Sequence, residues 1–117
     1  MRQQVFQVVL GVALCAAFPV FADLTFQKLD ADAVQILLSE KTLTYSDATQ
    51  QFYAAGRTLY TSSRPSWGYW SIRGAQYCSR WPPNSQCDCN DLWVSQDGTT
   101  VRFLDAWDNA SDGRFLE

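Results

Sequence analysis

The sequence contains no histidine in any of its 117 residues. Histidine is the usual general base beside a serine or cysteine nucleophile, and it is also the commonest metal ligand. Its absence excludes Ser–His and Cys–His nucleophile pairs and removes the nitrogen ligands that most zinc sites use. We therefore expect a protein that is not an enzyme and that carries no cofactor and no metal.

Basic residues are in the minority, with nine Lys and Arg against twelve Asp and Glu and a net charge of −3. A protein that binds nucleic acid needs a face of clustered positive charge. The acidic residues here are spread along the chain, which favours solubility without indicating a partner. We expect no nucleic-acid partner.

The chain also lacks a run of roughly 20 apolar residues, the length needed to span a bilayer. The longest apolar stretch, residues 5–18, follows the positively charged Arg2 and precedes Val20-Phe21-Ala22, which resembles a signal-peptidase site. This pattern predicts a signal peptide at residues 1–22. The protein is then expected to be periplasmic or secreted, with no membrane span after cleavage.

Residues 23–117 are enough for a single small β-rich domain. Such a domain buries only about 60–65% of its unfolded surface, so large aromatic side chains and cross-links matter to its stability. Residues 29–38 are predicted to form a short helix, with Asp30 as its N-cap. One face of that helix carries the apolar residues Leu29, Ala33, Ile36 and Leu37.

The stretch 66–83 predicts a β-hairpin that turns at Gly74. Period-two alternation places Gly68, Trp70 and Ile72 on one face, and the pattern resumes after the turn and puts Trp70 and Trp81 in the core. Further short strands are expected at residues 42–45, 51–54, 57–61, 87–94, 100–104 and 114–116. The expected fold class is α+β, mainly an antiparallel meander of about seven strands, curled or partly closed into a barrel, with one short N-terminal helix.

Three cysteines follow the predicted signal peptide: Cys78, Cys87 and Cys89. In an exported chain a disulfide bond is expected, and one thiol is left over. Joining Cys78 to either of the others closes a loop of similar length and contributes roughly 3 kcal/mol. The partner of Cys78 therefore stays open between Cys87 and Cys89. The Cys-x-x-Cys motif of redox proteins is absent, and three thiols fall short of the usual four zinc ligands.

All five tryptophans lie in the predicted domain, and exposed rings bind ligands as readily as buried rings build a core. Trp67 is the best candidate for exposure because it shares its strand face with Arg73. The candidate binding surface consists of Trp67, Arg73, Pro82, Pro83, Trp93 and Trp107.

Three aspartates near the C-terminus, Asp105, Asp108 and Asp112, resemble a calcium loop only in part. Ala110 occupies a position where the EF-hand pattern requires a ligand. The same acids offer a catalytic carboxylate pair, but a run of Asp, Asn, Ser and Gly is most often a solvated turn.

Several of these motifs occur together in a known group of proteins. Residues 67–74, followed by Tyr77-Cys78, Trp81-Pro82-Pro83 and Cys89, resemble small exported bacterial proteins of domain-of-unknown-function family 995 or a close relative. The resemblance covers most of residues 29–104. It implies a fold and an export route but no activity, and it implies that Cys78 pairs with Cys89 while Cys87 stands where another residue type is expected.

Gly68-x-Trp70 is also similar, more weakly, to the Gly-x-Trp motif of lipocalins. In lipocalins this motif lies on the first strand of a larger barrel, whereas here it lies in the middle of a smaller domain. A cavity of lipocalin size is therefore not expected, because a small eight-stranded barrel only just fills with its own side chains.

These features support two main functional hypotheses. The first is a non-enzymatic envelope-accessory module that binds an envelope protein through its sheet face or its Pro82-Pro83 loop. The alternative is a lipocalin-like carrier of a small apolar ligand, which requires an internal cavity. A third hypothesis is an enzyme that uses Asp105, Asp108 or Asp112. The sequence identifies neither the ligand nor the oligomeric state.

Overall fold

The computed structural model describes residues 25–116, and the signal peptide predicted at residues 1–22 lies outside the described residues. The described part contains one helix and nine strands. They are β1 (Phe26–Lys28), α1 (Ala31–Leu38), β2 (Lys41–Thr44), β3 (Thr49–Phe52), β4 (Arg57–Thr61), β5 (Pro65–Arg73), β6 (Gln76–Arg80), β7 (Asp88–Ser95), β8 (Thr100–Leu104) and β9 (Ala110–Phe115).

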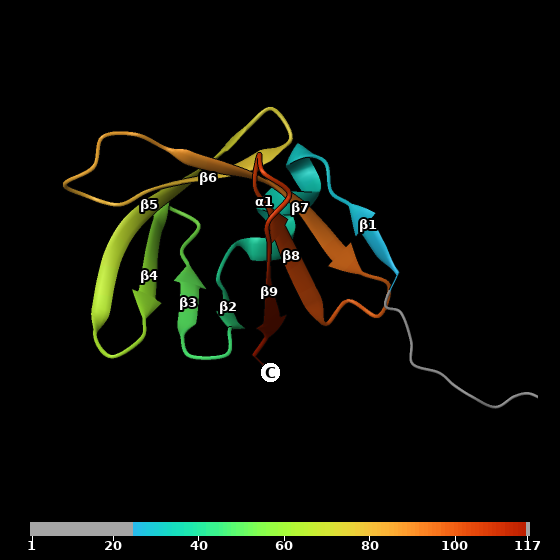
Figure 1. Ribbon diagram of the computed structural model, residues 1–117, viewed down its shortest axis with the longest axis horizontal. Coiled ribbons are helices and arrows are strands. Elements are labelled where there is room, and N and C mark those ends of the chain that lie inside the picture. Colours follow the sequence, from blue (N-terminus) through green and yellow to red (C-terminus); the bar gives the residue numbers. More distant parts are fainter. Residues whose placement is uncertain (1–24, 117) are drawn as a thin grey trace, which may run out of the picture.

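Strands β2 to β9 form a closed antiparallel barrel in which each strand pairs with the next along the chain. The barrel closes where β9 pairs with β2, with Phe115 opposite Leu43 and Arg114 opposite Thr44. Figure 1 shows these strands following one another around the barrel, with the β6–β7 loop reaching furthest to the left. Closure removes the free sheet edges that an open meander would expose. The predicted antiparallel meander with one helix is thus confirmed, and it has eight strands in the barrel.

Strand β1 is an addition that the sequence analysis did not predict. It pairs with β7 over Trp93–Ser95, whereas β6 pairs with the same strand over Asp88–Asp91. Because β8 occupies the opposite edge of β7, β1 and β6 lie one after the other along a single edge. β1 therefore continues the sheet outside the barrel, beside β7 (Figure 1).

Helix α1 begins as predicted, because the Asp30 Oδ1 atom accepts a hydrogen bond of 2.9 Å from the backbone N–H of Ala33. Its predicted apolar face was wrong in part. Val34 and Leu38 are completely buried, whereas Ile36 is 74% exposed. The segment carries two overlapping apolar stripes, and the contacts of α1 with β2, β5 and β6 select the stripe that enters the barrel.

The barrel has two different ends. The β3–β4 and β5–β6 turns and the α1–β2 connection lie at one end, and the β2–β3, β4–β5, β6–β7 and β8–β9 loops lie at the other. Helix α1 covers the first end, where apolar side chains fill the interior. The buried cluster consists of Val34, Leu38, Leu43, Phe52, Trp70, Tyr77, Leu92, Val101 and Phe103.

The central hairpin confirms the predicted alternation. Gly68 and Trp70 face the interior and Trp67 and Tyr69 face outward, and Gly74 turns the chain with a φ of +59°. The C-terminal strand differs from its prediction, because it begins at Ala110 rather than at residue 114. Residues 110–113, which were expected to belong to a turn, are paired with β8 in the sheet.

Candidate functional site

A cavity of about 700 Å³ opens at the end of the barrel opposite α1. This mouth cavity lies among the four loops at that end, and its volume falls within the range of small-molecule sites. No cavity of lipocalin size was expected from the sequence, and this open cavity at the mouth was not predicted. Its lining residues are Tyr45, Ser46, Gln50, Tyr60, Ser66, Tyr77, Ser79, Trp81, Asn90, Phe103, Asp105, Asn109, Ser111 and Asp112.

The cavity floor is organised around Gln50, which is only 6% exposed. Its side-chain oxygen accepts a hydrogen bond of 2.8 Å from the Tyr45 hydroxyl. Its side-chain nitrogen donates to Thr58 Oγ1 at 3.0 Å and to the Tyr77 hydroxyl oxygen at 3.3 Å. Buried polar groups are costly unless paired, so this amide fixes the positions of both tyrosine hydroxyls.

Both of these tyrosines stay neutral at physiological pH. Burial raises the pKa of Tyr77 to about 12, although hydrogen bonds from Gln50 and Ser79 act in the opposite direction. Burial also raises the pKa of Tyr45 well above its ordinary range, with smaller contributions from Tyr77 and Tyr60. A low-dielectric environment disfavours the charged phenolate, so the cavity presents intact hydroxyl groups.

One wall of the cavity is the indole ring of Trp81, which is half-buried rather than part of the predicted core. The ring lies directly over Gly68, where a Cβ atom would come within 2.5 Å of Trp81 Cε3. Tyr60 packs edge-on against it at a centroid distance of 6.2 Å. The indole N–H donates to Ser79 Oγ at 3.2 Å, so three neighbours hold the ring in place.

The charged side chains that line the mouth cavity are both acidic. Asp112 forms a bidentate ion pair with Arg102, at 2.8 and 2.9 Å. Asp105 accepts hydrogen bonds from the backbone N–H groups of Trp107 and Asn109, which hold its pKa below the usual range. Asp105 thus lies in a turn, as the solvated-turn interpretation predicted. The same prediction was wrong for Asp112, which lies on strand β9.

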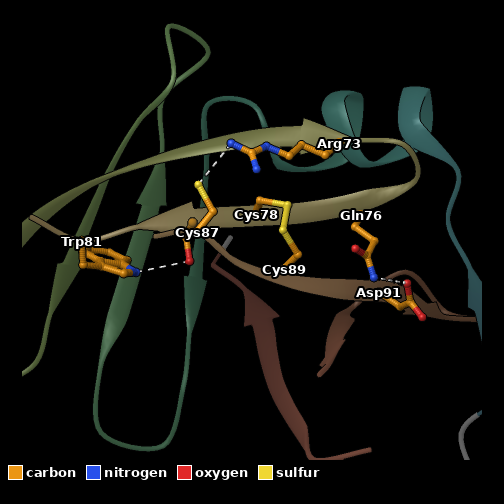
Figure 2. Close-up of a disulfide and its surroundings, with 8 residues drawn as sticks. Arg73, Gln76, Cys78, Trp81, Cys87, Cys89 and Asp91 are labelled. Carbon is orange, nitrogen blue, oxygen red and sulfur yellow. Dashed lines mark hydrogen bonds between the residues drawn. A yellow bond between two sulfur atoms is a disulfide. The ribbon is translucent and has the colours of Figure 1, made fainter. Parts of the chain in front are cut away.

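The disulfide bond joins Cys78 to Cys89. The two residues lie directly opposite each other on β6 and β7, which brings their Cα atoms within 4.0 Å. Cys87 precedes β7 and is the free cysteine among the described residues. Figure 2 shows Arg73 reaching from β5 toward Cys87, with its Nη2 atom 3.4 Å from the sulfur. The Cys78–Cys89 disulfide is the pairing that the family resemblance implied.

The outer face of the hairpin carries a stack of arginine and aromatic side chains. The Arg57 guanidinium lies 4.5 Å from the centre of the Trp67 ring and 5.5 Å from that of Tyr69, and Arg80 lies 4.5 Å from Tyr69. Trp67 and Tyr69 are 46% and 42% exposed. We call these four residues the arginine–aromatic face.

The structure does not gather the predicted binding residues into one site. Trp67 and Arg73 lie on the outer surface of β5, and Pro82 and Pro83 are exposed in the β6–β7 loop. Trp93 is half-buried on β7, with an indole nitrogen that has no hydrogen-bond partner in the described part of the chain. Trp107 is 82% exposed in the β8–β9 loop, between the cavity-lining residues Asp105 and Asn109.

The residues that form the mouth cavity were missed as a group. A signal for them is present in the sequence, because Gln50, Tyr77 and Ser79 are polar residues at inward-facing strand positions. Polar residues at such positions usually line a ligand site or join a buried network. Their convergence depends on strand pairing that local alternation does not reveal.

Within residues 25–116 no group of three or more His, Cys, Asp or Glu side chains is arranged to hold a metal ion. In the same range, no helix has the length and apolarity needed to cross a membrane. Comparison of the chain with family models, with curated proteins and with solved structures finds no match in any of the three.

Proposed function

We propose that this protein is an exported, non-enzymatic binding protein that holds a small molecule in the mouth cavity. The observation that carries the proposal is the open cavity of about 700 Å³ at the mouth of the barrel, lined by aromatic rings and hydrogen-bonding groups. Ligand sites combine such apolar surfaces with a few fixed polar groups. The Gln50 network and the fixed Trp81 ring supply both.

A binding role fits the chemistry of the lining better than catalysis does. The carboxylates at the cavity, Asp105 and Asp112, are committed to turn and ion-pair interactions. The tyrosine hydroxyls are neutral and hydrogen-bonded to Gln50. An activated nucleophile needs an adjacent base, and the chain contains no histidine to provide one.

Export is supported by the Cys78–Cys89 disulfide, because such bonds persist in oxidising compartments. The predicted signal peptide gives the same indication from the sequence. A periplasmic or secreted binding protein meets its ligand outside the cytoplasm.

Native mass spectrometry on protein purified from its export compartment tests this proposal. A ligand is expected as extra mass that is lost on denaturation, in the wild type and in a Trp67→Phe variant on the outer surface. The extra mass should be absent in a folded Trp81→Leu variant. Bare protein in all three samples, combined with no small molecule that changes tryptophan fluorescence, would overturn the proposal.

A second candidate function uses the arginine–aromatic face to bind an envelope protein. In residues 25–116 neither Arg57 nor Arg80 forms an ion pair with a carboxylate. Exposed aromatic rings and arginines are enriched at protein interfaces, so the chemistry fits a partner with a carboxylate-rich surface.

Binding of the protein to a surface coated with poly-L-glutamate tests this second function. The wild type should bind in a salt-dependent manner, and the charge reversal Arg57→Glu with Arg80→Glu should abolish binding. A Lys28→Glu variant, which changes a charge outside this face, serves as the control. Equal binding by the charge-reversed face would refute the assignment.

A further inference from the structure

We propose that the ligand of the mouth cavity is a neutral ring compound that bears hydroxyl groups, namely a sugar or a sugar derivative. In this arrangement Tyr77 donates a hydrogen bond, Tyr45 accepts one, and the ligand ring stacks on Trp81. The inference deepens the proposed function and rests on it.

The orientation of the Gln50 amide follows from Thr58. The Thr58 hydroxyl donates to the backbone carbonyl of Gln51 at 2.8 Å, so its single hydrogen is already used. Thr58 Oγ1 can therefore only accept a hydrogen bond from Gln50. This requirement places the amide nitrogen of Gln50 toward Thr58 and its oxygen toward Tyr45.

The direction of each tyrosine hydrogen bond then follows. Tyr45 gives its hydrogen to the Gln50 oxygen and retains lone pairs that accept from a ligand. Tyr77 receives a hydrogen from the Gln50 nitrogen, so its own hydrogen is not used in that bond. A hydroxyl group is the simplest ligand feature that satisfies both, because it donates and accepts at the same atom.

Ser79 fixes a neighbouring part of the lining, because its oxygen accepts the Trp81 indole hydrogen at 3.2 Å. The Tyr77 oxygen accepts from the Gln50 amide at 3.3 Å. The Tyr77 hydrogen remains for a ligand acceptor. The network thus carries a donor and an acceptor at the cavity floor before any ligand arrives.

Trp81 supplies a flat surface beside these polar groups. Gly68, Tyr60 and Ser79 fix the orientation of its ring. A sugar ring has an apolar face of C–H groups that packs on an aromatic face, while hydroxyls at its edge require hydrogen bonds. A fixed ring and fixed hydroxyls reduce the entropy lost when such a ligand binds.

The charge of the lining distinguishes a neutral ligand from an anionic one. The lining contains no lysine or arginine. Of its two acidic residues, Asp112 is neutralised by its ion pair with Arg102, whereas Asp105 keeps its charge at the cavity. A carboxylate or phosphate in the cavity would therefore face Asp105 without a cationic residue in the lining, which disfavours fatty acids, nucleotides and sugar phosphates. The polar side chains of Gln50, Ser79 and Asn90 also divide the apolar surface of the lining, so an alkyl chain would not find a continuous apolar site.

Isothermal titration calorimetry and tryptophan fluorescence with a panel of probes test the assignment. The neutral probes are methyl glucoside, N-acetylglucosamine and their disaccharides. Methyl glucuronide is the matched anion, laurate the apolar probe and choline the cationic probe. We expect saturable binding of a neutral sugar and at least severalfold weaker binding of the glucuronide.

Variants locate the binding in the cavity. Tyr77→Phe removes the donor and should weaken sugar binding about two- to tenfold, and Trp81→Leu should weaken it about tenfold or more. Tyr53→Phe removes a hydroxyl from the outer surface and should leave binding unchanged. Tyr45→Phe replaces Tyr77→Phe if near-ultraviolet circular dichroism shows that the latter is misfolded.

The outcomes separate this inference from the proposed function. Binding of laurate or choline that is sensitive to Trp81→Leu, without sugar binding, would overturn the ligand class and leave the cavity function standing. Sugar binding that neither variant weakens would place the sugar elsewhere and overturn the inference. Absence of binding by every probe also overturns it, and native mass spectrometry then decides the cavity function separately.

Discussion

The two ends of the barrel share one set of strands but have opposite interiors. At the end covered by α1 the inward-facing residues are apolar, and Leu43, Phe52 and Leu92 are almost completely buried. At the mouth the same strands turn Gln50, Ser79 and Asn90 inward. Along β3 the change occurs within two residues, from Gln50 near the mouth to Phe52 near the helix.

This difference assigns stability and recognition to separate parts of a very small domain. Apolar burial stabilises a fold at roughly 25 cal/mol per Å², and the helix end concentrates that contribution. The mouth keeps polar groups in fixed positions, which lowers the cost of binding rather than of folding. Substitutions at the two ends and changes of pH test this division of roles, beginning with the one that should change stability most.

Phe52→Ala at the helix end should have the largest effect on folding. The ring is 1% exposed and packs edge-on against Trp70 and Tyr77. Its removal leaves a cavity in the core and should lower the free energy of unfolding by about 3–5 kcal/mol, measured by urea denaturation. Ser66→Ala at the exposed rim of the mouth is the control and should change stability little. Equal effects of the two substitutions would contradict the division.

Removal of the disulfide should loosen the mouth more than the helix end. The Cys78–Cys89 bond closes the β6–β7 loop across a sequence separation of 11 residues. Cys78→Ser with Cys89→Ser should lower the free energy of unfolding by roughly 3 kcal/mol. Hydrogen exchange should increase first in this loop, while Cys87→Ser serves as the control with a small effect. Faster exchange confined to α1 would be the contrary result.

Gln50→Leu should affect both stability and binding. The substitution leaves Tyr45 without its acceptor and Thr58 without its donor. Unsatisfied buried polar groups cost about 1–3 kcal/mol, which urea denaturation should detect. Gln51→Leu, on the outward side of the same strand, is the matched control. A fully stable Gln50→Leu variant with unchanged ligand binding would show that the network does not organise the mouth.

Raising the pH should lower the free energy of unfolding through Tyr77, which is buried at the floor of the mouth cavity. The folded-state pKa of about 12 lies above the ordinary value of 10.0. The stability linked to Tyr77 is therefore fully present below pH 10 and is lost as the pH rises toward 12. Urea denaturation between pH 9 and 12 should show this loss, with a smaller slope for Tyr77→Phe. Identical slopes would contradict the assigned burial.

Lowering the pH should reduce the free energy of unfolding only slightly, through Asp97. This residue lies in the β7–β8 turn, at the end of the barrel that α1 covers. Hydrogen bonds from Ser95 and Thr99 lower the pKa of Asp97 to about 2. The stability linked to this exposed carboxylate is present above its unfolded pKa and lost as the pH falls through 2. Thermal unfolding of Asp97→Asn and the wild type should differ slightly at pH 5 and converge near pH 2. If the difference in stability between the wild type and Asp97→Asn increased as the pH fell, the Asp97 carboxylate would not stabilise the fold in the way proposed.

The sequence predicted the hairpin, its turn at Gly74 and the meander because these depend on local patterns. Alternation of Gly68, Trp70 and Ile72 is a property of one strand, and the fit of Asp30 as an N-cap is a property of four residues. The helix face was predicted wrongly at Ile36 because two apolar stripes overlap in one short helix. Only the packing of α1 against the barrel selects between them.

Local sequence patterns were sufficient to show which residues alternate along the strands and where the chain turns. Two features emerged only in three dimensions: Trp81 leaves the core to line a cavity, and Gln50 meets Tyr77. The Cys78–Cys89 pairing, which residue spacing left open and the family resemblance implied, is confirmed by the β6–β7 register. The depth of a residue along the barrel depends on the register between paired strands and on the closure of β9 onto β2, neither of which is visible in the alternation of a single strand. An inward-facing residue becomes core at the covered end and a binding group at the open one.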